Sequence, residues 1–478
     1  MENVTQQLIL SVCPDRVKIP PQYSDMIGEY LKVRVDGYWF AESYKNYLRL
    51  LKISDPQKRD RFRAMYAVWD GYYNFVRYNS FPTGLLPIVL EKLKENNIDF
   101  KIEKLYSLLN TKDNYELNGI KLRDYQEEAI KNVKEEQRGI IGLPPNAGKT
   151  EIALSVIKMF SVPSLFIVHL KELFYQTYKR AKVRLGIEPG LIGDGKYQLS
   201  DFMNICMIQT LLKLGQKEFI SNSKVVILDE VHHFTGEGNW YSWALKNLRS
   251  CIVRIGLSAT PFRNNDVSDW KLMGLTGGVL KKISNSFMIS SGYSASPSII
   301  FYKVGDKENI DRELSYQRVL DKYVVNNDAR NKLIKNIVES YKDKNILICV
   351  SRIKHGKNLQ KLIPDSIFMY GKNDTEYRQN IIQQFKDRKL RVLISTLLGE
   401  GINIVNIEVL ILASPFKSLI PVLQRVGRGL RKKEINEVAI IDFIDYTSIY
   451  LLKQSYERIK IYKDEEFKIE QKDKLDGV

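Results

Sequence analysis

A Gly-Lys-Thr triplet at residues 148–150 lies between an apolar run and a helix-like segment, in "GLPPNAGKTEIAL". A phosphate-binding loop is usually written G-x-x-x-x-G-K-[ST], and here Leu143 takes the place of its first glycine. The run "RGIIGL" before the loop indicates a strand, and "TEIALSVIKMF" after it has the apolar spacing of one helical face. A strand, a loop and a helix are the context that the motif requires, which favours a nucleotide site over a chance match.

The loop residues suit particular roles toward a nucleoside triphosphate. Backbone N–H groups at the positive end of a helix can wrap a β-phosphate, Lys149 can bridge the β- and γ-phosphates, and Thr150 can hold Mg²⁺. Asn146 tolerates the left-handed backbone that glycine would otherwise supply. We expect the following residues to surround the phosphates: Pro145, Asn146, Ala147, Gly148, Lys149, Thr150 and Glu151.

Two acids end a second apolar run, "KVVILDEVHH", about 80 residues after the loop. An open α/β sheet presents such groups to a ligand at its carboxyl edge. Asp229 can bind Mg²⁺ through its water shell, and Glu230 can orient or deprotonate the water that attacks the γ-phosphate. Two solvated acids at a strand end are ordinary by themselves, but their position after a phosphate loop favours catalysis.

Two further motifs carry hydroxyl and cationic side chains. "GLSATPFR" follows a β-run with Ser258 and Thr260, which can link the nucleotide site to a neighbouring surface by hydrogen bonds. "QRVGRGLRK" holds Arg428 and Arg431 at helical spacing. Arginines on a second domain can stabilise transition-state charge when the domains close. An exposed basic helix is the alternative.

The chain alternates β-rich apolar runs with helix-like segments from about Gly139 onward. Continuous Val/Ile/Leu runs separated by amphipathic stretches indicate parallel strands with helices on both faces. We predict an α/β fold with two tandem doubly wound domains, at residues 116–296 and 297–478. A long helix and a charged tail are expected after Asp445.

The first 115 residues lack this alternation and are predicted to form a small α+β domain, 1–115. Asp70-Gly71 lies there between aromatic, β-prone runs in "AMYAVWDGYYNFVRY". This pair is a strong signal for a two-residue hairpin turn. Basic residues interleave with aromatic ones in this block, as on a nucleic-acid surface, although such aromatics more often belong to a core.

Composition narrows the class of protein. The formal net charge is +17 and the pI is near 9.3, which favours a polyanionic partner. No apolar run approaches the roughly 18 residues of a membrane span, and no secretory leader is evident, so a cytoplasmic location is expected. Cys13, Cys206, Cys251 and Cys349 form no C-x-x-C pair, and the last three should be small buried hydrophobes.

In this order the motifs resemble those of the superfamily 2 helicases and translocases of the DExH type, over roughly residues 122–445. The resemblance implies two RecA-like domains, ATP with Mg²⁺, catalysis by Lys149, Asp229 and Glu230, and Thr150 and Asp229 as the metal-holding pair. It adds Gln424, Arg428 and Arg431 at the γ-phosphate and makes His232, Ser258 and Thr260 coupling residues. Further nucleotide contacts would be Arg123, Tyr125, Gln126, Gly401 and Asn403, although the family often has Asp where Asn403 stands. The nucleic-acid contacts would be Lys171, Gln209, Thr210, Arg352 and Thr396.

The stretch "RFRAMYAVWDGYYNFVRYNSFPTGLL" is similar to the small N-terminal domain of phage recombination and branch-migration helicases. That resemblance implies a monomeric motor in the host cytoplasm. Its partner would be branched or forked DNA, held mainly through phosphates, with no membrane involved. Three alternatives stay open from the sequence: an RNA helicase, the motor subunit of a restriction system, and a nucleic-acid scaffold that does not hydrolyse ATP.

Overall fold

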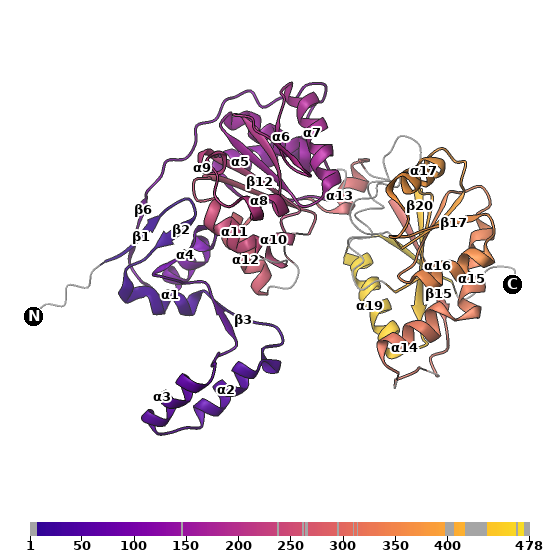
Figure 1. The fold of residues 1–478 in the computed structure, drawn as a ribbon, viewed down its shortest axis with the longest axis horizontal. Helices are drawn as coiled ribbons and strands as arrows, with labels where there is room; N and C mark the ends of the chain where they lie inside the picture. The colour runs from indigo at the N-terminus through magenta and orange to yellow at the C-terminus, as the bar shows by residue number, and fades with distance from the viewer. Residues whose placement is uncertain are drawn as a thin grey trace, which may run out of the picture. The chain divides into compact units, whose positions relative to one another are not determined.

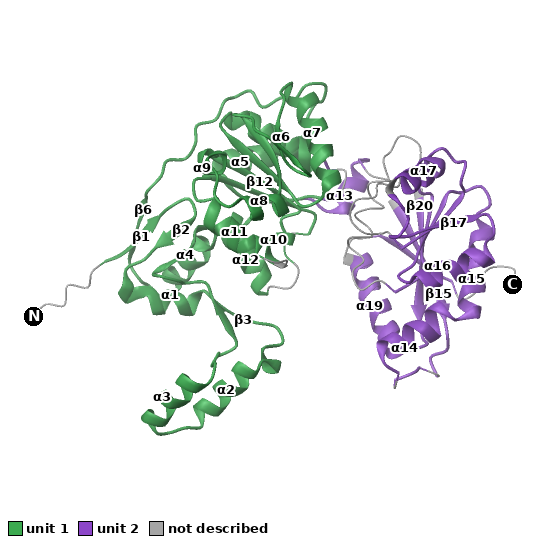
Figure 2. Cartoon of the chain, in the orientation of Figure 1, with its two compact units in different colours: residues 1–143, 148–282 green, residues 144–147, 283–478 purple. Residues whose placement is uncertain are grey.

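The computed structural model describes residues 7–144, 147–236, 239–260, 262, 266–293, 296–308, 310–312, 314–396, 406–415, 437–464 and 467–472. Within it the chain divides into two compact units (Figures 1 and 2). The first comprises residues 1–143 and 148–282, and the second comprises residues 144–147 and 283–478.

An eight-stranded sheet forms the centre of the first unit, in the order β10-β9-β11-β8-β12-β13-β7-β14. Its strands are parallel except for β10, which pairs antiparallel with β9. The strands are β7 (Arg138–Gly142), β8 (Ser164–Val168), β9 (Gly190–Gly193), β10 (Lys196–Gln198), β11 (Met203–Met207), β12 (Val225–Asp229), β13 (Val253–Ser258) and β14 (Val279–Lys282). The central strands β8, β12 and β13 are buried along their whole length, as expected for parallel strands covered on both faces.

Helices cover both faces of this sheet (Figure 1). One group comprises α5 (Asp124–Glu136), α6 (Lys149–Phe160) and α7 (Lys171–Leu185), which pack in sequence against one another. The other group comprises α8 (Ile208–Leu214), α9 (Glu218–Asn222), α10 (His233–Gly236), α11 (Trp240–Asn247) and α12 (Val267–Thr276). The apolar residues of α8 and α11 join those of β8 and β12 in one core cluster.

The second unit contains a seven-stranded parallel sheet in the order β17-β18-β16-β19-β20-β15-β21. Its strands are β15 (Ser296–Val304), β16 (Ile346–Cys349), β17 (Ser366–Met369), β18 (Val392–Ser395), β19 (Val409–Leu412), β20 (Glu437–Asp445) and β21 (Lys468–Lys472). Its helices are α13 (Asn285–Ser290), α14 (Tyr316–Leu320), a π-helical turn at Asp321–Val325, α15 (Asp328–Ser340), α16 (Ile353–Leu362), α17 (Thr375–Lys386) and α19 (Ile449–Asp464).

The N-terminal part of the first unit has a small mixed sheet of its own, in the order β5-β2-β1-β6. Its strands are β1 (Leu8–Val12), β2 (Arg16–Lys18), β5 (Ser80–Pro82) and β6 (Phe100–Lys104), and a separate ribbon pairs β3 (Lys32–Arg34) with β4 (Tyr72–Asn74). Its helices are α1 (Ser24–Tyr30), α2 (Glu42–Leu51), α3 (Pro56–Met65) and α4 (Leu86–Glu95), with 3₁₀ turns at Pro21–Tyr23, Tyr38–Phe40 and Thr83–Leu85.

The predicted fold class is confirmed: two large parallel sheets follow a small mixed one, as in tandem RecA-like domains. The predicted long helix after Asp445 is present as α19, and Cys206, Cys251 and Cys349 are buried. The division at residues 115 and 296 stays a prediction. Within the described residues, no helix is long and apolar enough to cross a membrane.

One local prediction is wrong, and a second is incomplete. No hairpin is centred on Asp70-Gly71, because β4 pairs with β3 from an earlier part of the chain. The Trp69 backbone N–H instead donates to the Ser43 carbonyl oxygen at 3.1 Å, which draws this segment toward α2. The tail expected after α19 also contains β21, which adds to the sheet beside β15.

The N-terminal sheet is packed directly on the large sheet's helix α12. Val267, Trp270 and Met273 of α12 join the N-terminal apolar core. Gly84 lies at this junction, and a Cβ on it would overlap the backbone carbonyl oxygens of Met273 and Gly274. Only glycine allows the two backbones to approach this closely.

We expect Gly84→Ala to lower the free energy of unfolding of the first unit by about 1–3 kcal/mol, because backbone atoms cannot move aside as a flexible side chain can. All five tryptophans lie in this unit, so urea unfolding followed by tryptophan fluorescence measures it selectively. Gly278→Ala is the matched control, because a Cβ there meets no atom within 4 Å. Equal effects of the two variants would contradict the close-packing argument.

A buried polar network supports the second unit. Arg330 pairs with Asp445 and donates to the Ala413 carbonyl oxygen at 3.2 Å. His355 is fully buried, with Nε2 3.0 Å from Asn331 Oδ1 and Nδ1 3.3 Å from Ser414 Oγ. Burial, and secondarily the Arg330 charge, lowers the pKa of His355 to about 3.

This lowered pKa predicts a stability change at acid pH. Between about pH 6.5 and 3 the unfolded chain binds a proton at His355 that the folded chain excludes, so stability falls as the pH falls. We expect the wild type to lose about 2–3 kcal/mol more than His355→Gln between about pH 6.5 and 4.5. Gln keeps a donor and an acceptor but does not titrate.

Urea unfolding followed by circular dichroism at both pH values measures this difference, and tryptophan fluorescence gives an internal control from the first unit. Parallel losses in the two proteins would show that His355 contributes nothing to the acid sensitivity.

Candidate nucleotide site

Three neighbouring strands of the eight-stranded sheet in the first unit end at the same level. Asp229, the last residue of β12, is opposite Leu257 of β13, and Ser258, the last residue of β13, is opposite Gly142 of β7. The Leu143 N–H then donates to the Ser258 carbonyl oxygen at 2.9 Å. This register brings three of the predicted motifs to one carboxyl edge, where parallel sheets bind ligands.

The predicted phosphate loop leads into α6 through Gly148. Its φ of +81° is a left-handed value that glycine adopts without strain. A Cβ here would overlap the side-chain amide of Gln126, so the loop and α5 are in contact. Lys149 is the first residue of α6, and its Nζ donates to the Leu143 carbonyl oxygen at 3.1 Å. The lysine therefore folds back over the loop instead of extending into solvent.

The two acids lie directly across from this lysine. Glu230 Oε1 is 3.7 Å from Lys149 Nζ, and both side chains are largely buried. Asp229 is also buried, and its Oδ1 accepts from the Glu230 backbone N–H at 3.1 Å. Glu230 has a φ of +46°, an unusual value for a residue other than glycine, and such strain concentrates at functional sites.

The predicted coupling residues form a connected chain. His232 Nδ1 is 3.6 Å from Glu230 Oε2 and 3.0 Å from Ser258 Oγ. Ser258 Oγ also accepts from the Thr260 backbone N–H at 3.1 Å. The structure thus joins Glu230 to the segment after β13 by three polar contacts. Val231 lies against Gly256, where a Cβ would come within 2.8 Å of its Cγ1.

The residues predicted to read the base occupy the start of α5. Arg123 caps the helix, and its backbone N–H donates to Gln126 Oε1 at 2.9 Å. Arg123 Nη1 donates to the Tyr125 hydroxyl at 2.7 Å. Gln126 is buried and contacts Gly148, so it is adjacent to the predicted phosphate loop.

The residues predicted to contact nucleic acid lie at the same sheet edge, after β8 and β11. Gln209, in α8, donates from Nε2 to the His169 carbonyl oxygen at 2.8 Å, and Thr210 follows it. Lys171, the first residue of α7, pairs with Asp194 at 2.9 Å. The hydrogen bond with Asp194 raises the pKa of Lys171, so this lysine carries a positive charge at neutral pH.

In the second unit, two predicted contacts follow neighbouring strands. Arg352 caps α16 after β16, and its guanidinium donates to Gln317. Thr396 follows β18, and its backbone N–H donates to the Met369 carbonyl oxygen at 3.3 Å. Both therefore lie at the carboxyl edge of their own sheet. The remaining predicted residues lie outside the described ones: Pro145, Asn146, Gly401, Asn403, Gln424, Arg428 and Arg431.

Sequence reasoning overlooked a cluster of histidines beside the site. His169 is 4.3 Å from His233 between ring centroids, and His233 is 4.3 Å from His232. Three of the four histidines of the chain thus meet at one edge of the sheet. His169 directly follows β8, so the strand-end rule that identified Asp229 also applies to it.

Two family models match the chain. "Type III restriction enzyme, res subunit" matches residues 119–263, and "Helicase conserved C-terminal domain" matches residues 328–433. The DNA 3'-5' translocase XPB2 of Sulfurisphaera tokodaii is 28% identical over 367 residues, which cover 68% of this chain and 82% of that protein. The ATP-dependent DNA helicase uvsW of Enterobacteria phage T4 is 27% identical over 468 residues, which cover 85% and 90%.

Solved structures share the fold at low identity. The Type ISP restriction-modification enzyme LlaBIII bound to DNA has a TM-score of 0.53 at 15% identity, over 81% of this chain and 34% of that one. Dbp5 of S. cerevisiae, bound to RNA and ADP BeF3, has a TM-score of 0.50 at 14% identity, over 74% of this chain and 91% of that one.

With the two sheets and the two matched models, the chain belongs to the superfamily 2 helicases. Within that class it is an ATP-dependent helicase or translocase, an enzyme that hydrolyses ATP.

We expect Ser258→Ala to weaken the connection between hydrolysis and nucleic acid. The variant loses the contacts to His232 and Thr260, each worth about 0.5–1.5 kcal/mol, so stimulation of ATP hydrolysis by nucleic acid should fall about 2- to 10-fold with little change in the unstimulated rate. Phosphate release with and without nucleic acid measures both rates. Ser164→Ala, at the opposite end of this sheet, is the control; an equal fall there would contradict a specific role for Ser258.

Proposed function

We propose that the protein is an ATP-driven DNA motor that acts on branched DNA. It would migrate Holliday junctions, regress forks and unwind displacement loops in phage recombination and replication. The observation that carries the proposal is the pairing of Lys149 with Glu230, 3.7 Å apart at the carboxyl edge of the first sheet. ATP hydrolysis needs a lysine that neutralises phosphate and an acid that activates water, and the fold brings both groups to one place.

The choice of DNA draws on the relatives and on charge. Two relatives are named for DNA, one as a translocase and one as a helicase. The formal net charge of +17 suits a long polyanion. Binding through phosphates predicts weak sequence preference and a steep loss of affinity with salt.

The site residues fit a triphosphate with Mg²⁺. Gly148 leaves the loop open where a Cβ would close it against Gln126, and the helix that follows presents its N-terminal N–H groups. Thr150 and Asp229 supply hard oxygen donors, which Mg²⁺ prefers together with phosphate oxygens. When bound, Mg²⁺ would neutralise charge on the phosphates. The described residues hold no cluster of three or more His, Cys, Asp or Glu side chains placed for a metal.

In the proposed cycle, ATP displaces Glu230 from Lys149, because the phosphates compete for the ammonium group. The freed carboxylate can then orient the attacking water, and His232 passes its change of position to Ser258. Arg428 and Arg431 of the second domain would then place positive charge beside the γ-phosphate, and Gln424 would lie with them. When the domains close and reopen, the DNA contacts of one domain move along the strand relative to those of the other.

We expect Glu230→Gln to bind ATP but to hydrolyse it about 10²- to 10⁴-fold more slowly, because it lacks the base that activates water. DNA-stimulated phosphate release measures the rate, and fluorescent ATP binding measures retention of the site. Glu218→Gln, an exposed acid of α9, is the control. Equal and negligible hydrolysis by wild type and Glu230→Gln would favour a scaffold that does not hydrolyse ATP.

The substrate class is tested by comparing ATPase stimulation by a four-way junction, a fork, plain duplex DNA and single-stranded RNA. We expect the junction and the fork to stimulate hydrolysis most strongly. A clear preference for RNA would instead support an RNA helicase, and equal stimulation by plain duplex would support a restriction-type translocase.

A further inference from the structure

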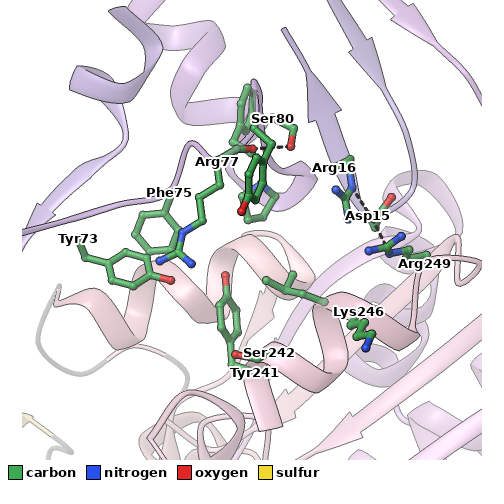
Figure 3. Close-up of a pocket in the computed structure, with 14 residues that line it drawn as sticks. Asp15, Arg16, Tyr73, Phe75, Arg77, Ser80, Tyr241, Ser242, Lys246 and Arg249 are labelled. Atoms are coloured by element: carbon green, nitrogen blue, oxygen red, sulfur yellow. Dashed lines mark hydrogen bonds and ion pairs between the residues drawn. The ribbon is translucent and has the colours of Figure 1, made fainter. Parts of the chain in front are cut away.

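A cavity of about 290 Å³ lies in the first unit, between the N-terminal sheet and α11 (Figure 3). We call it the Arg77 pocket. The N-terminal side supplies residues of β2, β4, β5 and the turn between β4 and β5, and the other side supplies residues of α11 and the turn after it. The lining residues used below are Asp15, Arg16, Tyr73, Arg77, Tyr78, Tyr241, Lys246 and Arg249.

The Arg77 pocket carries excess positive charge. Asp15 is the acid that lines it, and this carboxylate is shared by Arg16 at 2.8 Å and Arg249 at 3.9 Å. Within the part of the chain that the structure describes, Arg77 and Lys246 have no carboxylate partner. Two arginines already neutralise one acid, so the remaining two cations favour an anionic ligand.

Aromatic rings line the same pocket. The Arg77 guanidinium lies over the Tyr73 ring, 5.4 Å from its centroid. Figure 3 shows Arg77 reaching down toward Tyr73, with Tyr241 on the facing helix. Tyr241 is buried, and burial raises the pKa of its hydroxyl, so it stays neutral and offers a hydrogen bond. Cations beside aromatic rings are the combination that binds nucleic-acid strands.

A tight turn presents Tyr78 at this pocket. The Arg77 N–H donates to the Ser80 carbonyl oxygen at 2.8 Å, and the Ser80 N–H donates back at 3.1 Å. The two residues between them, Tyr78 and Asn79, have φ values of +53° and +50°. This is the pattern of a type I′ turn, whose central positions favour Asn and Gly. A tyrosine there costs backbone strain.

Tyr78 is also 98% exposed, so its ring gains nothing from burial in the protein. A large aromatic residue that is both strained and exposed makes no contribution to folding that would explain it. Strained residues of this kind concentrate where ligands bind. The pocket walls are held together by the close packing of Gly84 on α12, which fixes Tyr78 relative to α11.

We propose that the Arg77 pocket binds a backbone phosphate of a DNA strand and that Tyr78 stacks on the adjacent unpaired base. Arg77 and Lys246 contact the phosphate, and the exposed ring takes the base face. A paired base inside a duplex is covered by its neighbours on both sides, so a single exposed ring selects an unpaired base such as one at a branch point. The inference rests on the proposed DNA motor function.

The stacking part is tested with a forked DNA that carries 2-aminopurine at its unpaired junction base. We expect the wild type to change the fluorescence of this base on binding and Tyr78→Asn not to, while Tyr78→Trp restores the change. Asn suits the left-handed backbone of the turn, so this variant removes the ring without straining the fold. Affinity should fall between about 5-fold and about 150-fold, the range for one stacked base.

Tyr197→Ala is the control for the loss of an exposed tyrosine, because Tyr197 lies on β10 away from the pocket and is 50% exposed. It should leave both fluorescence and affinity unchanged. If Tyr78→Asn also leaves them unchanged, the stacking proposal is wrong.

The phosphate part is tested by the salt dependence of binding. Arg77→Gln should weaken binding to all sequences equally and reduce the slope of log affinity against log salt by about 0.7, the value for one contact on a single strand. Lys94→Gln, an exposed lysine of α4 without an ion pair among the described residues, is the control and should leave the slope unchanged. An unchanged slope in Arg77→Gln would overturn the assignment.

The two levels of proposal fail differently. If no DNA stimulates ATP hydrolysis by the wild type, the motor function itself is wrong. If forked DNA stimulates the wild type, and Tyr78→Asn and Arg77→Gln behave like their controls, the motor stands and the Arg77 pocket has no part in DNA binding.

Discussion

The alignment of three strand ends is the constraint on which the rest of the site depends. Parallel hydrogen bonding fixes β12, β13 and β7 so that Asp229, Ser258 and Gly142 reach the same edge. A shift of one residue in this register would turn each side chain to the opposite face of the sheet. The Val, Ile and Leu residues of these strands are buried on both faces, so such a shift would disrupt the packing on each face, and the core holds the polar residues in place.

The N-terminal part of the chain packs on helix α12 of the same unit. Because Gly84 allows the N-terminal backbone to approach α12 closely, the small sheet and the first large sheet belong to one compact unit. A surface carried by the small sheet is therefore positioned by the domain that contains the nucleotide site. A strand held at the Arg77 pocket would therefore be bound by the same compact unit that carries Glu230.

Much of this arrangement follows from the sequence, for a physical reason. Uninterrupted apolar runs identify buried parallel strands, and strands that run in one direction must end at one edge, which places Lys149, Asp229 and Ser258 together. The Arg77 pocket could not be predicted in this way, because Arg77 and Tyr241 line one pocket only through the packing of the N-terminal part of the chain on the helices of the first unit. No spacing in the chain encodes that meeting.

The Asp70-Gly71 prediction failed for a related reason. A local turn preference was outweighed by hydrogen bonds from Trp69 to Ser43 and from Val35 to Gly71, which belong to a longer loop. Strand β21 could not be recognised in the sequence, because the charged residues Lys468, Glu470 and Lys472 leave too few apolar residues to show the alternation of a strand. Only Ile469 and the preceding Phe467 pack on the core.

Strand β21 has a consequence for the solubility of the protein. It covers β15, a nine-residue strand rich in Ile, Phe and Tyr that would otherwise be the last of the sheet. An uncovered strand of that length offers a row of backbone groups to any similar strand, which is a common start of aggregation. The five residues of β21, four of them charged or polar, thus shield the second sheet from self-association, and removal of this segment by a protease would expose β15.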